Sequence, residues 1–269
     1  MGLIETATSP FGETVPIHIS FILMWVAGIG GLLFLMVHAV YVRYFAKAEE
    51  FAAATVPANV PDKITRHGLG ARLFHWIMAL AMLTLLFTAF LPKLGFQFDW
   101  VEFHWIAGLV LTASILFHIV HATFWQDLWA IWPDKIDMED AKRRWLRARG
   151  ESSPPPRKFA KYPLENKMYH LVIVLAGLSV TITGLFMMKR VRTPIFTRNP
   201  YVFGDMTWGL MYVLHGLAGV GLIGLIIVHI YFALRPEKLV LTKSMVTGGL
   251  DREHYLEHHD PQRWAPQSK

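Results

Sequence analysis

The chain has 269 residues, of which 54% are hydrophobic and only 17% are charged. A soluble domain of this length carries about 25% charged residues, so the composition excludes an ordinary soluble protein. The absence of cysteine excludes disulfides, iron–sulfur clusters, thiolate zinc sites and c-type haem attachment. The net charge of +6 is no sign of nucleic-acid binding, because membrane proteins concentrate Lys and Arg in their cytoplasmic loops.

Five apolar stretches come close to or exceed the roughly 20 residues that cross a bilayer. In chain order they are Ile17–Tyr41, Leu73–Leu91, Phe103–Trp125, Tyr169–Met188 and Trp208–Leu234. The first is predicted to be a retained anchor, because no Lys or Arg precedes it and it is too long for the apolar region of a signal peptide. The sequence therefore predicts an all-α integral membrane protein with five transmembrane helices.

The basic residues are distributed unevenly between the two sets of loops. Residues 42–72 contain five Lys and Arg, residues 126–168 contain ten and the segment after Leu234 contains six, whereas the other loops hold five of the total of 26. Basic residues gather on the cytoplasmic side of a membrane. We therefore predict a multi-pass protein of the bacterial inner membrane with a periplasmic N-terminus and a cytoplasmic C-terminus. The largest loop contains a charged segment, residues 138–149, that is predicted to be helical.

Histidine inside a transmembrane span is costly and indicates function. On the third span His104 and His118 are 14 residues apart, and His215 and His229 have the same spacing on the fifth span. Fourteen residues return to within about 40° of the same helix face and rise about 21 Å. Each helix is thus predicted to present two imidazoles on one side, which suits two haem b groups held between helices, one toward each membrane surface.

Glycine follows two of these histidines at the same offset, as Gly108 after His104 and Gly219 after His215. A residue without a side chain lets a flat macrocycle lie against the helix. Packing between membrane helices also uses glycine, but the repetition of His-x-x-x-Gly on two helices favours haem binding.

His75 near the cytoplasmic end of the second span is a further candidate ligand. Arg66 and Arg72 precede it and can either pair with haem propionates or serve only as topological charge. His170, at the start of the fourth span, is a candidate for quinone or proton handling, and His38 is interpreted as a lone polar residue. The remaining cytoplasmic histidines are predicted to lie on the surface: His67, His254, His258 and His259.

From about Arg66 to Trp264 the sequence resembles the membrane cytochrome b (gamma) subunit of respiratory formate dehydrogenase. Related subunits serve other molybdenum enzymes and nickel–iron hydrogenases. The likeness is carried by Arg72-Leu-Phe-His75-Trp76, Phe103-His104-Trp-Ile-Ala-Gly108, Lys161-Tyr162, Asn166-Lys167-Met168, Leu214-His215-Gly-Leu-Ala-Gly219, Val228-His229-Ile-Tyr231-Phe-Ala and His258-His259-x-Pro261-x-Arg263-Trp264.

This resemblance implies four haem ligands, His75, His104, His215 and His229, in a four-helix dihaem domain over residues 66–269, after an anchor and loop over residues 1–65. It also implies a quinone pocket with Lys161, Tyr162 and Asn166. The implied partners are an iron–sulfur subunit and a catalytic, molybdenum-containing subunit. Electrons would pass from the outer haem (His104/His215) to the inner haem (His75/His229) and on to quinone, or in reverse. The first span, His118 and His170 have no counterpart in the family pattern.

Three alternatives remain open at this point. A hydrogenase cytochrome b subunit fits the same motifs. A minimal bc-type cytochrome b would pair His104 with His215 and His118 with His229, so His75 and His118 compete for the inner haem. The spacing favours His118, and the sequence around His75 favours His75. A transporter with polar intramembrane histidines would bind no chromophore.

Overall fold

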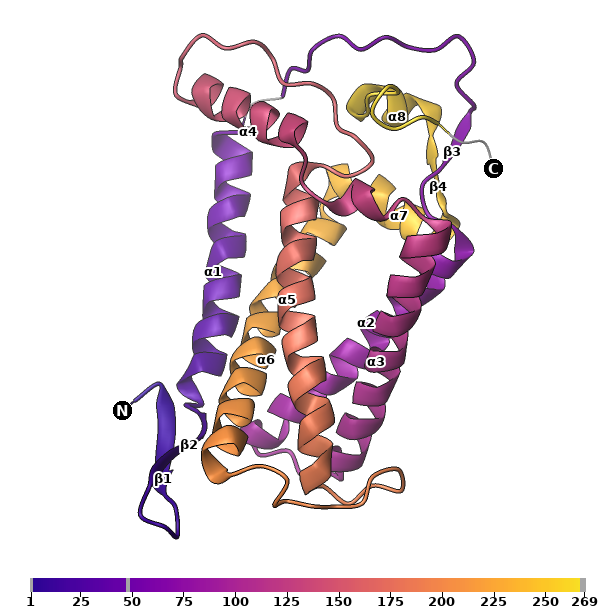
Figure 1. The fold of residues 1–269 in the computed structure, drawn as a ribbon. Coiled ribbons are helices and arrows are strands. Elements are labelled where there is room, and N and C mark those ends of the chain that lie inside the picture. Colours follow the sequence, from indigo (N-terminus) through magenta and orange to yellow (C-terminus); the bar gives the residue numbers. More distant parts are fainter. Residues whose placement is uncertain (1, 47–48, 267–269) are drawn as a thin grey trace. The chain divides into compact units, whose positions relative to one another are not determined.

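The computed structural model describes residues 2–46 and 49–266. Five helices in these residues are long and apolar enough to cross a membrane: α1 (Ile22–Tyr44), α2 (Leu69–Phe90), α3 (Trp100–Trp125), α5 (Leu164–Met187) and α6 (Asp205–Leu234) (Figure 1). A helix satisfies its own backbone hydrogen bonds, as the water-free membrane interior requires. The predicted all-α membrane fold with five spans is confirmed.

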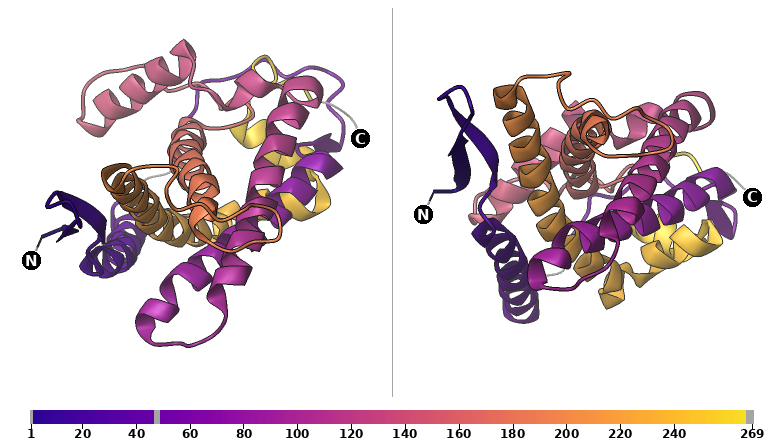
Figure 2. Two further views of the ribbon diagram at one scale, coloured as in Figure 1. Left: turned by 60° about the horizontal axis from the view of Figure 1, so that its bottom comes forward. Right: turned by 90° about the horizontal axis from the view of Figure 1, so that it is seen from below.

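An N-terminal β-hairpin is the main departure from the predicted elements. Strands β1 (Ile4–Thr8) and β2 (Thr14–Ile19) pair antiparallel, and the three views in Figures 1 and 2 show them as one hairpin next to the N-terminus. Gly12 turns the chain with a φ of 83°. The predicted first span was wrong in including residues 17–21, because Ile17 and Ile19 belong to β2 and α1 begins at Ile22.

The hairpin packs on α6 within the same compact unit. A Cβ atom at Gly209 would lie 1.9 Å from the carbonyl oxygen of Pro16, and one at Gly216 would lie 3.0 Å from Ile19. Glycine at these two places of α6 therefore permits close contact with β2 and with the residue that ends it.

The other long helices begin three to five residues before their predicted starts. Helix α2 begins at Leu69, so that Arg72 and His75 lie in its first two turns. Helix α5 begins at Leu164, which places Asn166 and Lys167 in its first turn instead of in a loop. Hydropathy did not predict these helix starts, because the residues at the helix ends are polar.

Short helices and strands occupy the segments between the long helices and the segment after α6. The predicted charged helix is α4 (Lys135–Ala148), which starts at a capping box between Asp134 and Asp137. Strand β3 (Lys63–Thr65) pairs antiparallel with β4 (Gly249–Asp251), beside a small core of Val60, Ile64 and Tyr255. The remaining elements are helices α7 (Leu239–Thr247) and α8 (Arg252–His258) and the 3-10 turns Pro92–Leu94, Leu128–Ile131, Met188–Arg190 and Pro236–Lys238.

The chain divides into two compact units. The first comprises Met1–Ala39, Trp76–Phe117 and Ile173–Tyr231, and the second comprises Val40–His75, His118–Val172 and Phe232–Lys269. Each of the five long helices contributes residues to both. The predicted division into residues 1–65 and 66–269 and the membrane orientation stay predictions. Lys47 and Lys269, which entered the comparison of basic residues, lie outside the described residues.

Candidate functional site

Two predicted haem ligands face each other in the first unit. The imidazole rings of His104 on α3 and His215 on α6 have centroids 6.2 Å apart and planes inclined by 62°. These two residues are 111 positions apart in the sequence, so only the tertiary fold brings them together. The pairing predicted from their matched positions is consistent with this geometry.

A threonine on a neighbouring helix holds each of these rings. Thr88 Oγ1 on α2 lies 2.8 Å from Nδ1 of His104, and Thr183 Oγ1 on α5 lies 2.9 Å from Nδ1 of His215. Each hydroxyl already donates its hydrogen to the carbonyl four residues earlier, that of Thr84 at 2.7 Å or of Ser179 at 2.5 Å. The hydroxyl therefore accepts from Nδ1–H, which leaves Nε2 as the free metal-binding nitrogen of each ring.

The separation of the two rings fits two ligands of one haem iron. A bond from an imidazole nitrogen to a first-row metal ion is about 2 Å long, so two imidazoles that bind one ion from opposite sides have ring centres roughly 6 Å apart. The observed separation of 6.2 Å agrees with this value. Neutral imidazole is the usual axial ligand of haem b, and the tautomer set by the threonines supplies it.

Gly108 and Gly219 are not required by helix packing. A Cβ atom at Gly108 would meet only Leu85, at 3.9 Å, and one at Gly219 would meet only Phe90, at 3.9 Å, which is ordinary contact. The packing interpretation of these two glycines therefore loses its support. Gly184 is different, because a Cβ atom there would lie 3.3 Å from Cε1 of His215 and would press on the ligand ring. No sequence motif marks Gly184, Thr88 or Thr183.

The inner ligands of the predicted set lie in different units. His75 is in the part of α2 that belongs to the second unit, and His229 is in the part of α6 that belongs to the first. Their pairing stays a prediction.

His118 contacts two aromatic rings that its 14-residue spacing from His104 does not predict. Its ring stacks on Phe74 at a centroid distance of 4.2 Å and an angle of 9°. The ring of His170 lies 6.4 Å away at 64°, close to the values for His104 and His215. Within the described residues, Nδ1 of His118 is buried and has no hydrogen-bond partner. Both residues belong to the second unit, and His170 at the start of the fourth span was the only sequence signal for this contact.

The residues predicted for quinone binding are only partly brought together. The Tyr162 ring lies 5.4 Å from Nζ of Lys161 and 5.4 Å from the guanidinium carbon of Arg66, and it also meets His67 at 6.4 Å. Asn166 is exposed in the first turn of α5. Whether these residues bind quinone stays a prediction.

The prediction that His259 lies on the surface is wrong. Its exposed fraction is 3%, its Nδ1 donates to the carbonyl of Ala160 at 2.7 Å, and its Nε2 lies 3.5 Å from Nη1 of Arg66. Burial, followed by the positive charge of Arg66, lowers the pKa of His259 to about 3. His67 is partly buried, and burial together with Arg66 and Lys161 lowers its pKa to about 3 as well. Both rings are therefore neutral at physiological pH.

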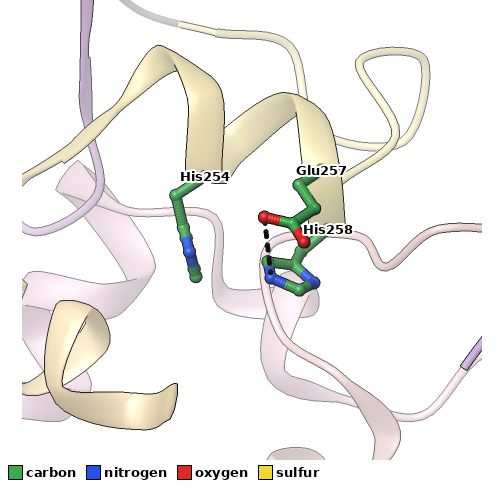
Figure 3. A group of neighbouring side chains, drawn as sticks. All are labelled: His254, Glu257 and His258. Carbon is green, nitrogen blue, oxygen red and sulfur yellow. Dashed lines mark ion pairs between the residues drawn. The ribbon is translucent and has the colours of Figure 1, made fainter. Parts of the chain in front are cut away.

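His254, Glu257 and His258 form a second cluster of possible metal ligands on α8. One nitrogen or oxygen from each lies within 4.8 Å of the others, and Figure 3 shows the three side chains together, with the ion pair between Glu257 and His258 dashed. Positive charge from Lys238 acts on both histidines and contributes to lowering their pKa values, after the larger effect of burial. The same charge opposes the binding of a divalent cation, so we assign no metal to this cluster.

Comparison with known protein families agrees with this geometry. A sequence model of the prokaryotic cytochrome b561 family matches residues 66–248, about two thirds of the chain. No curated protein matches the chain significantly. The chain belongs to the prokaryotic cytochrome b561 family. It is therefore a multi-pass bacterial membrane cytochrome b that binds haem b and transfers electrons. The transporter alternative, which predicted no chromophore, is set aside.

Proposed function

We propose that the chain is a dihaem membrane subunit that passes electrons between a partner oxidoreductase and the quinone pool. The observation that carries the proposal is the pair His104/His215, with each ring oriented by a threonine. Histidines placed there only for packing would not need both Nδ1 atoms bonded so that, among the described residues, both Nε2 atoms stay available.

The second haem is proposed from the ligands that remain. His229 follows His215 by 14 residues on α6, a rise of about 21 Å, so that α6 can supply one ligand to each of two haems. His75 is the proposed partner of His229. The haems supply one-electron transfer when bound, and the histidines hold and orient them.

Quinone is proposed to react beside Tyr162 and Asn166. A phenol donates a hydrogen bond and an amide both donates and accepts, so these side chains can hold the two carbonyl groups of a quinone and pass protons as it is reduced. Lys161 would add a positive charge that favours the reduced, anionic forms. His170 lies in α5, eight residues after Tyr162. It is the proposed path for protons between the quinone and the membrane interior.

The proposed partner is an iron–sulfur subunit with a molybdenum-containing catalytic subunit of the formate dehydrogenase type. This step rests on the motifs that resemble the gamma subunit, among them the segments around His75 and His229. A nickel–iron hydrogenase is the second candidate, since the chain's family motifs suit that partner equally.

The purified complex tests these statements separately. We expect a pyridine haemochrome ratio of two haem b per chain and a low-spin spectrum with two histidine ligands. A ratio of one would contradict the dihaem proposal and leave family membership intact. Mass spectrometry of co-purified subunits identifies the partner, and reduction of the haems by quinol or by the partner's substrate gives the direction of electron flow.

A further inference from the structure

A cluster of basic side chains in the second unit has no carboxylate partner in the described part of the chain. It consists of Arg66, Arg72 and Lys161, which gather around His67 and Tyr162. Arg66 has an exposed fraction of 4%. Within residues 2–46 and 49–266, none of the three basic groups forms an ion pair with a carboxylate. Burial of an uncompensated charge is costly, so the buried Arg66 would gain most from an anionic partner.

Among the described residues, Arg66 contacts uncharged groups. Its guanidinium lies over the rings of Tyr162 at 5.4 Å and Trp264 at 5.6 Å, and Nη1 lies 3.5 Å from Nε2 of His259. Burial lowers its pKa, and the opposing effect comes from Tyr162 and from no carboxylate. The aromatic rings shield the cation but leave its charge unbalanced.

Arg72 is held in a similar state. Its Nη1 donates to the carbonyl of Val246, while its Nε is buried and has no hydrogen-bond partner in the described part of the chain. A Cβ atom at Gly248 would lie 3.3 Å from the guanidinium of Arg72 and 2.8 Å from the carbonyl of His67. Gly248 also has a φ of 88° and accepts hydrogen bonds from the backbone of Arg66 and His67. Glycine at this position therefore brings Arg72 next to the Arg66–His67 segment.

His67 is at the centre of the cluster. The positive groups that act on it are Arg66, Lys161 and Arg72, and His75 acts on it as well. The imidazole stays neutral and adds no charge of its own. His75, one turn after Arg72 on α2, thus lies close enough to share this surrounding.

We propose that Arg66 and Arg72 bind an oxyanion group, and that this group is the carboxylates of the haem whose ligand is His75. The phosphate of an anionic lipid headgroup has the same chemistry and is the second source to be distinguished. Guanidinium groups bind planar or tetrahedral oxyanions through two parallel hydrogen bonds. The haem source is favoured because the cations surround the segment that leads into His75. This inference rests on the proposed role of His75 as a ligand.

The test is a redox titration of the purified protein with Arg66→Gln and Arg72→Gln variants, followed by the absorbance of each haem. Removing a cation next to haem carboxylates favours the oxidised state. We expect the midpoint potential of one haem to fall by about 59 mV, which corresponds to a tenfold decrease in its reduced-to-oxidised ratio for one electron. The potential of the other haem should stay unchanged. Arg66→Lys retains the charge and should restore most of the potential.

Lys63→Gln is the matched control, because Lys63 is an exposed cation in the same unit that is already paired with Asp251. Phosphorus analysis of extensively delipidated samples forms the second arm. Loss of one bound phospholipid in the Arg variants, with both potentials unchanged, would assign the site to lipid phosphate. Two haems per chain with unchanged potentials and unchanged phospholipid would overturn the oxyanion site, whereas fewer than two haems in the unmodified protein would instead count against the proposed function.

Discussion

Thr183 accepts a hydrogen bond from Nδ1 of His215 at 2.9 Å, and this contact decides which ring nitrogen is free. Thr183→Val removes the acceptor and lets the ring rotate. Partners of this kind typically change metal affinity by about 10–100-fold, so we expect haem affinity at this site to fall at least about tenfold. The haem-to-protein ratio after transfer of haem to apomyoglobin measures the effect.

Thr183→Ser retains the hydroxyl and should behave as the unmodified protein. Thr112→Val is the matched control, because among the described residues the Thr112 hydroxyl donates to the carbonyl of Gly108 and contacts no imidazole. Equal haem loss in the Thr112 and Thr183 variants would show that the hydrogen bond to His215 has no special role.

The inner ligand is decided by a set of three substitutions. We expect His75→Ala to lose one of two low-spin haems, because its imidazole is removed from the iron, and His118→Ala and His170→Ala to keep both. Haem content and redox titration are the measurements. If His118→Ala loses the inner haem while His75→Ala keeps it, the pairing of His118 with His229 is correct. If His170→Ala loses it as well, the contact between His118 and His170 is the ligand pair.

Quinone binding is tested by Tyr162→Phe and Asn166→Ala. A neutral hydrogen bond contributes about 0.5–1.5 kcal/mol, so each variant should raise the KM for quinone roughly fivefold without changing haem content. Tyr201→Phe is the control, because that side chain is 91% exposed in a loop of the other unit. Unchanged quinone kinetics in both variants would remove Tyr162 and Asn166 from the site.

The orientation follows from the distribution of basic residues and is open to direct test. We expect a fluorescent-protein fusion after Lys269 to be fluorescent, because green fluorescent protein folds on the cytoplasmic side. A phosphatase inserted at Gly12, in the turn of the β-hairpin, should be active because it reaches the periplasm. The reverse pattern of the two activities would refute the orientation.

Asp137 joins α4 to the first turn of α5 through a buried ion pair with Lys167. Its Oδ2 lies 2.6 Å from Nζ of Lys167, whose exposed fraction is 2%, and its Oδ1 lies 2.9 Å from Arg263. Among the described residues, Asp137→Asn leaves the carboxylate of Asp134, at 3.8 Å, as the remaining ion-pair partner of Lys167. We expect a loss of about 3 kcal/mol in the free energy of unfolding of this region, measured by amide hydrogen exchange in α4.

The same contact predicts a dependence on pH. Burial alone would raise the pKa of Asp137, but hydrogen bonds from Lys167, the Asp134 backbone and Arg263 together lower it. A carboxyl group with a lowered pKa in the folded state contributes stability above its unfolded pKa of about 3.9, and that stability is lost as the pH falls through the folded value. We expect α4 to lose protection below about pH 4, with less loss in Asp137→Asn. Glu151→Gln, in the exposed pair with Arg149, should change neither result.

The sequence by itself determined the five spans and the helical class, and it predicted which histidines hold the haems. Hydropathy is a sum over 20 consecutive residues, and the spacing of His215 and His229 depends only on helical periodicity, so both are local properties. The cytochrome b family was also predictable, because the motifs around His75, His104, His215 and His229 are contiguous. Helix starts and the β-hairpin were missed, because polar residues such as Asn166 and the short alternation in Thr14–Ile19 carry little hydropathy signal.

Only the tertiary structure decided which residues contact the predicted ligands. Thr88 and Thr183 are ordinary threonines in apolar helices, and nothing local distinguishes them from Thr112. They become important because α2 lies against α3 at His104 and α5 lies against α6 at His215. The contact of His118 with His170 and the burial of Arg66 beside His259 arise in the same way. A hydrogen bond or an unbalanced charge depends on which groups are within a few ångströms in space, and residues far apart in the chain determine that.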